Sequence, residues 1–114
     1  MLRHGHLKAE FRHWHLHQVA LEKLRLHPEL MSAVRALLEQ WLKSEALLPS
    51  RPWLQEWQAM LTHWSFEKLC STVLDWKQGQ VLRQCSPLGP VPSPQERWAA
   101  LAEADRQFDQ QMNT

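Results

Sequence analysis

Apolar residues recur every three or four positions along most of this chain, and no stretch shows a convincing alternation of apolar and polar residues. The observed spacing places apolar side chains on one face of an α-helix, whereas a half-buried strand needs a period of two. A length of 114 residues suits one domain. We therefore predict an all-α fold, a single-domain bundle of five to six short helices that spans residues 1–114.

The first two predicted helices differ in how their apolar residues are arranged. The first covers residues 7–26 and is apolar on more than one face, which predicts a central place in the bundle or a second face for a partner. The second follows Pro28, a residue favoured in the first turn of a helix. Its apolar residues keep to one face, and they are Leu30, Val34, Leu37, Leu38, Trp41 and Leu42.

Serines are expected to cap the later helices, because a serine hydroxyl can accept a hydrogen bond from a free N–H of the first turn. Ser50 and Ser65 precede a third and a fourth helix, and Ser93 with Glu96 predicts a capping box for the last. Residues 81–84 are expected to form a short helix, and flexible ends are expected at 1–6 and 110–114. The residues expected to face the core in the third and last helices are Trp53, Trp57, Met60, Leu61, Trp64, Trp98, Leu101, Phe108 and Met112.

Composition limits the classes of function. The formal net charge is +1, whereas nucleic-acid binders usually carry a strong basic excess. No apolar run approaches the roughly 18 residues of a membrane span, and neither Cys70 nor Cys85 has a CxxC partner. We expect a cytoplasmic protein with reduced thiols and no membrane partner. Most of the seven tryptophans are expected in the core, with one or two at an interface.

Histidines gather near the start of the chain. His13 and His17 lie one helical turn apart and form a weak candidate for a metal site, while His15 points to the opposite side. Glu10 is the one helix neighbour that could add a ligand. The commoner interpretation is a polar flank that gains charge as the pH falls toward about 6. We expect no metal and no other cofactor.

Charge is distributed unevenly along the chain. Residues 1–26 hold five Lys and Arg against two acids, and residues 88–114 hold four acids against two arginines. A basic first helix could contact DNA phosphates, although a solvated helix face is the commoner explanation.

No motif supports catalysis. The chain has no GxSxG, no HExxH and no phosphate-binding glycine loop, and it contains three glycines in all. Cys70 and His63 are the nearest approach to a nucleophile and a base, with no third group to orient them. We expect that the protein is not an enzyme.

A proline-stiffened segment at residues 86–93, here called the elbow, is the remaining candidate. Prolines reduce the entropy that a loop loses when a partner holds it, and Arg and Trp are frequent anchors of interfaces. We therefore predict partner contacts from the elbow and its flanks, and the alternative is that the elbow only connects two helices. The predicted contact residues are Leu82, Arg83, Gln84, Ser86, Pro87, Leu88, Gly89, Arg97 and Trp98.

Residues 17–101 resemble a family of short helical bacterial proteins that are encoded beside toxins of nucleotidyltransferase or related type. The family shows a His-Pro-Glu-Leu-like helix start, a Trp-rich helix, and an LRQ-x-SP-x-G signature followed by ER-W. The matching residues here are His27–Leu30 with Trp41, then Trp53 and Trp57, then Leu82–Gln84, Ser86–Pro87, Gly89 and Glu96–Trp98. Leu88 stands where the family has Phe, and Pro90 and Pro92 stiffen the loop further.

The resemblance implies an antitoxin-like protein that neutralises its partner, a cognate toxin, by direct protein contact. Arg83 and Arg97 would then either pair with acidic residues of the toxin or hold the elbow through local salt bridges. The alternative function is a DNA-binding regulator of its own operon. The identity of the toxin, the oligomeric state (a homodimer included), and metal binding by the histidines stay open at this stage.

Overall fold

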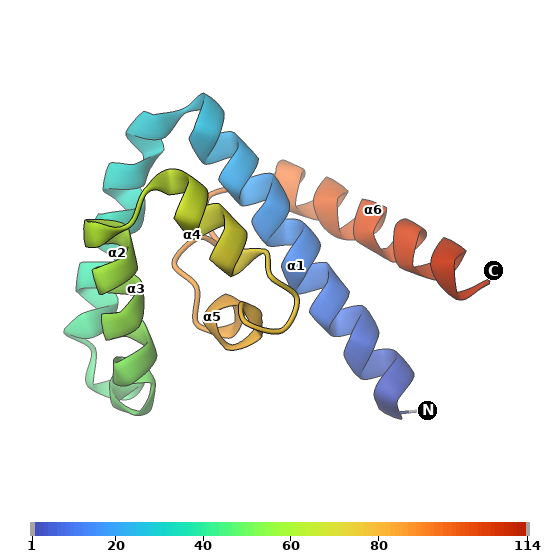
Figure 1. Ribbon diagram of the computed structural model, residues 1–114, viewed down its shortest axis with the longest axis horizontal. Helices are drawn as coiled ribbons and strands as arrows, with labels where there is room; N and C mark the ends of the chain where they lie inside the picture. The colour runs from blue at the N-terminus through green and yellow to red at the C-terminus, as the bar shows by residue number, and fades with distance from the viewer. Residues whose placement is uncertain (1, 114) are drawn as a thin grey trace.

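The computed structural model describes the backbone of residues 2–113 and the side chains of residues 6–113, and it confirms the predicted all-α class (Figure 1). The described part contains six α-helices and two 3₁₀ turns, with no strand. The α-helices are α1 (Leu2–Leu26), α2 (Met31–Leu42), α3 (Arg51–His63), α4 (Phe66–Val73), α5 (Gln80–Gln84) and α6 (Pro94–Met112), and the 3₁₀ turns are η1 (Pro28–Leu30) and η2 (Glu45–Ser50).

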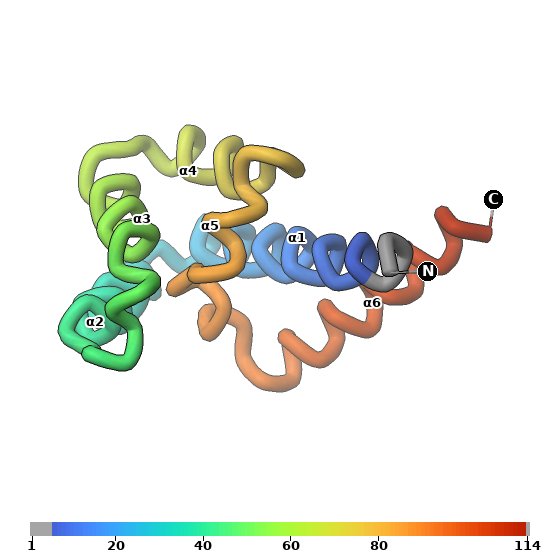
Figure 2. The backbone as a smooth tube through the Cα atoms, turned by 90° about the horizontal axis from the view of Figure 1, so that it is seen from below, coloured from blue at the N-terminus to red at the C-terminus, as the bar shows by residue number. Residues whose placement is uncertain are grey.

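The two longest helices, α1 and α6, lie antiparallel and form an arm that extends away from the α2–α3 hairpin (Figures 1 and 2). The face of α6 that packs here consists of Ala100, Ala104 and Phe108, spaced four residues apart. Small side chains let the backbones approach closely, and the Phe108 ring meets Phe11 of α1 at a centroid distance of 6.0 Å. The arm therefore joins the first and last segments of the chain.

The main core lies where α1 meets α2, α3, α4 and α5. Trp57 of α3 is fully buried at its centre, and its Nε1–H donates to the Leu82 carbonyl oxygen at 3.0 Å. Burial of so large a side chain, with its one polar group satisfied, favours a unique arrangement of the helices. The other buried apolar residues of this cluster include Leu21, Leu24, Val34, Leu38, Leu54, Met60, Leu69, Val73 and Leu88.

Two of the three predicted serine caps are confirmed. The Ser65 hydroxyl accepts from the Lys68 N–H, and Ser93 and Glu96 form the complete capping box. The prediction for Ser50 was wrong, because Ser50 is the last residue of η2 and has helical backbone angles, so its side chain makes no capping bond. The chain enters α3 directly from a 3₁₀ turn, and no extended capping residue is needed.

The predicted core faces of α3 and α6 need correction. Trp53 is 44% exposed and Trp98 is 76% exposed, because Leu54 and Ala100 occupy the inward positions next to them. Met112 is also exposed, so only Phe108 and the half-buried Leu101 of the predicted α6 stripe turn inward. The close approach of α1 to α6 selects small side chains over large ones.

Both segments that were predicted to be flexible contain helical residues. Helix α1 begins at Leu2, within the segment 1–6, and α6 continues to Met112, within the segment 110–114. The predictions for Met1 and Thr114 lie outside the described residues. Among the helices described, none combines the length and the apolar character that a membrane crossing requires.

Candidate functional site

The predicted contact residue Arg83 lies inside the fold. Its side chain is 3% exposed and reaches from α5 to the end of α4. There Nη1 donates to the carbonyl oxygens of Val73 and Asp75, at 2.6 and 3.0 Å, and Nη2 donates to that of Trp76 at 3.0 Å. Burial lowers the pKa of this guanidinium, and the charges of Glu10 and Asp75 act in the opposite direction. Arg83 therefore supplies donors to the Val73 carbonyl at the end of α4 and to the Asp75 and Trp76 carbonyls of the loop that follows, where the Asp75 oxygen also accepts from the Gly79 N–H.

Gly79 makes this contact geometrically feasible. A Cβ atom at Gly79 would lie well inside van der Waals contact of the Val73 carbonyl oxygen and of Arg83 Nη1. The absence of a side chain lets α5 come close enough for the guanidinium to reach α4.

The elbow is also held by contacts within the chain. Leu88 is fully buried, and its N–H donates to the Ser86 hydroxyl at 3.0 Å. Arg97 Nη1 donates to the Gly89 carbonyl oxygen at 3.0 Å. The elbow is thus held in place between α5 and α6. Arg83 and Arg97 donate to backbone carbonyls of the chain, where one of the two alternatives considered for them was local salt bridges.

The predicted contact residues differ in their exposure to solvent. Leu82, Arg83, Pro87 and Leu88 are buried and unavailable to a partner in this conformation. Ser86 and Gly89 are half-buried, whereas Gln84, Arg97 and Trp98 are exposed. The structure thus separates the residues of the LRQ-x-SP-x-G signature that build the fold from a few that reach the surface.

The candidate histidine pair does not converge on a metal site. His17 is 4% exposed, and its Nδ1 donates to the His13 carbonyl oxygen at 2.7 Å, while the His13 side chain is exposed. Burial lowers the pKa of His17 to about 4, and the nearby charges of Arg83 and Arg97 act in the same direction. Within the part of the chain that the structure describes, no three His, Cys, Asp or Glu side chains are grouped to hold a metal ion.

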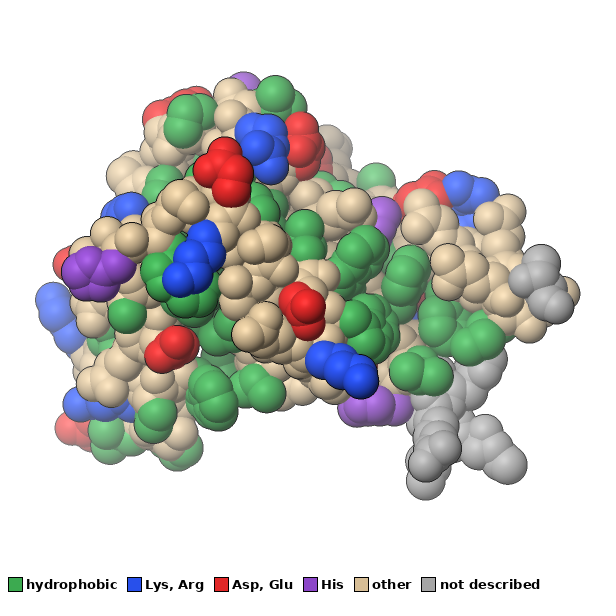
Figure 3. Space-filling model, viewed as in Figure 1, with side chains coloured by type: hydrophobic (Ala, Val, Ile, Leu, Met, Phe, Trp, Pro, Cys, Tyr) green, Lys and Arg blue, Asp and Glu red, His purple; other side chains and the backbone are tan. Residues whose placement is uncertain are grey.

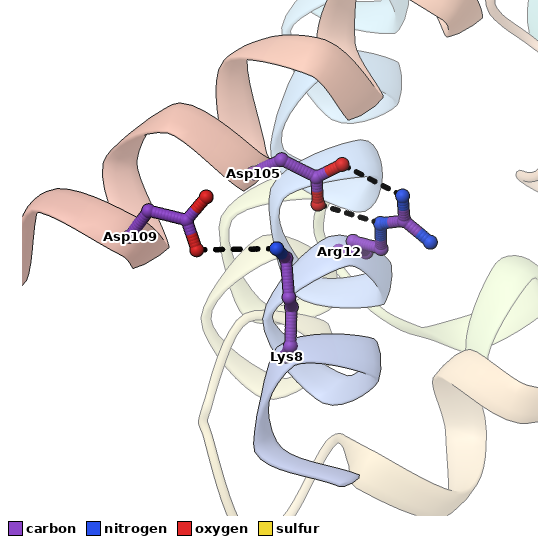
Figure 4. A network of polar contacts seen from close by, with 4 residues as sticks. All are labelled: Lys8, Arg12, Asp105 and Asp109. Carbon is purple, nitrogen blue, oxygen red and sulfur yellow. Dashed lines mark hydrogen bonds and ion pairs between the residues drawn. The ribbon is translucent and has the colours of Figure 1, made fainter. Parts of the chain in front are cut away.

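Basic side chains of α1 form ion pairs with acidic side chains of α6. Arg12 of α1 forms a two-pronged contact with Asp105 of α6, at 2.7 Å for both bonds, and Lys8 pairs with Asp109 at 3.1 Å (Figure 4). Lys23 pairs with Glu96 at 2.6 Å, which holds the pKa of that carboxyl at about 2 together with the capping bonds from Ser93. These contacts neutralise much of the basic charge on which a DNA interface at α1 would depend.

An apolar hollow opens at the far end of the arm, where α1, α6 and residues 74–76 meet (Figure 3). Its volume is about 400 Å³, and we call it the distal hollow. It is lined by Leu7, Phe11, Trp14, Leu74, Trp76, Phe108 and Gln111. Leu7 and Trp76 are 39% and 40% exposed, and the neighbouring Met112 is 44% exposed.

Aromatic packing shapes the walls of the distal hollow. The Trp14 Nε1–H donates to the Leu74 carbonyl oxygen at 2.6 Å, which ties residues 74–76 to α1. Phe11 stacks on Trp14 with ring centroids 5.9 Å apart, and the Trp76 ring lies near the Arg83 guanidinium. The wall formed by Trp76 is therefore held by Arg83 of α5, and the wall formed by Leu74 is held by Trp14 of α1.

The distal hollow was not among the predicted sites. Its one signal was the apolar character of the first helix on more than one face, which predicted a second face for a partner. Half-exposed apolar side chains grouped around a concave surface are typical of interaction sites, whereas single exposed ones are ordinary. Comparison with known proteins adds nothing to this site, because no protein-family model, no curated protein and no solved structure matches the chain.

Proposed function

We propose that this chain is an antitoxin-like protein that acts in the cytoplasm and neutralises a toxin of nucleotidyltransferase or related type by direct contact. Such a protein needs a surface that covers or distorts the toxin, and it needs no chemistry of its own. The resemblance at the LRQ-x-SP-x-G signature supplies the class of partner. The observation that carries direct binding is the distal hollow, whose lining residues Leu7 and Trp76 are 39% and 40% exposed.

The surface of the distal hollow has the properties of a protein interface. Interface cores are apolar and rich in aromatic residues, and a few buried anchors carry most of the binding energy. Three tryptophan and phenylalanine side chains of α1 and α6 line it, and its volume of about 400 Å³ has room for more than one side chain. Exposed Arg97 and Trp98 are a separate candidate contact on α6.

The alternative, a DNA-binding regulator, has weaker support. Lys8, Arg12, Lys23 and Arg25 of α1 each lie within ion-pair distance of an acidic side chain. A phosphate would have to compete with these internal partners for each cation, which reduces the gain from counterion release.

The test is co-expression with the protein encoded by the neighbouring gene. We expect the neighbouring protein to arrest growth, the chain to restore it, and the two to elute together as a stoichiometric complex. A chain that neither restores growth nor binds its neighbour would contradict the proposal, and recovery of operator DNA alone would favour the regulator.

A further inference from the structure

We infer that the distal hollow binds the apolar face of one α-helix of the partner protein. This inference rests on the function proposed above and specifies which surface is used and which kind of element it takes. The occupant would lie between α1, α6 and residues 74–76 and complete a local helix bundle that the described residues leave open on one side.

The size of the hollow suits a helix. Its wall on α1 runs from Leu7 through Phe11 to Trp14, which are spaced at four and three residues along one face. Seven residues of helix rise by about 10 Å, so this wall is two turns long. A partner helix with apolar residues at i, i+3 or i+4, and i+7 presents an apolar face of the same length.

Polar groups in the walls argue against an extended peptide. A strand that binds by its backbone needs free N–H and C=O groups on the receptor, usually at a sheet edge. Here the Leu74 carbonyl oxygen already accepts from Trp14 Nε1, and no strand occurs among the described residues. The backbone N–H and C=O groups of a helix are already paired within the helix, so a helix can bind through apolar side-chain contacts alone.

The charges around the hollow also favour an occupant helix whose contacting face is uncharged and apolar. Lys8 and Asp109, which neighbour the lining residues Leu7 and Phe108, pair with each other. Asp75 and Lys77 carry opposite charges on the two sides of Trp76. Both margins are therefore balanced, and they complement an uncharged apolar surface better than a strongly basic or acidic segment.

A second copy of this chain does not supply such a helix. Away from the distal hollow, the large apolar side chains that are exposed in the described part lie on separate elements, and they are Leu26, Leu48, Trp53, Val81 and Trp98. No two of them form a pair one turn apart on one helix. Among the described surfaces outside the hollow, none therefore supplies the occupant, and we assign it to the partner protein.

Matched substitutions test the location. Trp76→Gln and Leu7→Glu change the hollow, and Trp53→Gln and Leu48→Glu change the same residue types at similar exposure elsewhere. We expect the hollow variants to weaken binding of the co-expressed neighbouring protein by about 30-fold or more, the size of an interface anchor. The controls should bind within about threefold of the unsubstituted chain. Urea unfolding of each variant verifies that it folds.

If the unsubstituted chain binds and all four variants bind equally well, the inference fails while the proposed function stands. If the unsubstituted chain does not bind, the proposed function itself fails. Hydrogen exchange of the partner then tests the type of element. Protection should fall on one segment with apolar residues at i, i+3 or i+4, and i+7, and a synthetic peptide of that segment should become helical on binding. Protection of a loop or strand would overturn the inference.

Discussion

The α5–elbow region and the distal end of the arm use their side chains in opposite ways. In the first region, hydrogen bonds to the chain's own backbone are formed by the side chains of Arg83, Arg97 and Ser86. Leu88 of the same region is fully buried. At the end of the arm, the apolar side chains around Trp76 stay half exposed. The segment rich in Arg and Pro, predicted to contact a partner, makes many of its contacts within the fold. Among the described residues, the apolar hollow lies near the ends of the two longest helices.

The contrast between the two regions shows that an arginine in a sequence motif can have either of two roles. Arginine is frequent at interfaces because its guanidinium can make several directed hydrogen bonds, and the same property suits it to cap carbonyl groups inside a fold. Only the positions of the acceptors distinguish the two uses. For Arg83 the acceptors are three carbonyls between residues 73 and 76, which the loop before α5 brings into reach.

The largest expected difference is between the losses of stability caused by replacing Arg83 and Arg97. Arg83→Ala leaves the carbonyl oxygens of Val73 and Trp76 without a donor, while that of Asp75 keeps the Gly79 N–H. A buried polar group without a partner costs about 1–3 kcal/mol, and the packing of the buried Arg83 side chain is lost as well. We expect the free energy of unfolding to fall by about 3 kcal/mol or more, as measured by urea denaturation monitored by far-UV circular dichroism. Arg97→Ala removes one exposed hydrogen bond and should cost about 1 kcal/mol or less. Equal losses in the two variants would contradict the distinction between them.

Acid should destabilise the fold through His17. The pKa of His17 is about 4 in the folded chain and about 6.5 when unfolded, so the unfolded state binds more protons between these values. Stability should therefore be full above about pH 6.5 and fall as the pH drops toward 4, by up to about 3 kcal/mol. The measurement is the urea midpoint at a series of pH values.

The control for this pH dependence is His17→Gln, which cannot gain the charge. The charged or titratable groups that influence His17 are His13 on its own helix, Arg83 of α5 and Arg97 of α6. The variant should lose most of the slope between pH 6.5 and 4. The smaller remainder should reflect His15, whose pKa burial lowers, and the carboxyls of Glu96, Glu103 and Asp105, whose pKa values hydrogen bonds lower. A full slope in the variant would remove His17 as its cause.

The smallest expected effect concerns the ion pairs along the arm. Arg12 lowers the pKa of Asp105 through its hydrogen bonds, but both side chains are partly exposed to solvent. Arg12→Gln should therefore cost at most about 1 kcal/mol, and less at high salt. Lys8→Gln, which removes a single contact with Asp109, should cost less than Arg12→Gln when both are measured at low salt. A loss as large as that of Arg83→Ala would contradict the contrast between buried and exposed charges.

Local features of the fold could be predicted, and features that depend on distant segments could not. The Ser93–Glu96 capping box needs only neighbouring residues, and it forms as predicted. The packing face of α6 depends on how closely α1 approaches, so the small Ala100 and Ala104 turn inward and Trp98 outward. Hydrophobicity alone favoured the opposite assignment.

The candidate site follows the same rule. The opposite charges of the chain's two ends were visible, but their pairing required the antiparallel placement of α1 on α6. The distal hollow combines Trp14 with Trp76, residues whose contact depends on the path of the chain through α2 to α4. Periodicity could indicate only that the first helix is apolar on more than one face.

The central claim is that the hollow, and not the elbow side of α6, binds the partner. Its most direct test is to measure the dissociation constant of the neighbouring protein for Trp76→Gln and Trp98→Gln, beside the unsubstituted chain. We predict a loss of about 30-fold or more for Trp76→Gln and less than about threefold for Trp98→Gln, with both variants folded. A large loss for Trp98→Gln with normal binding by Trp76→Gln would contradict the claim and place the interface beside the elbow.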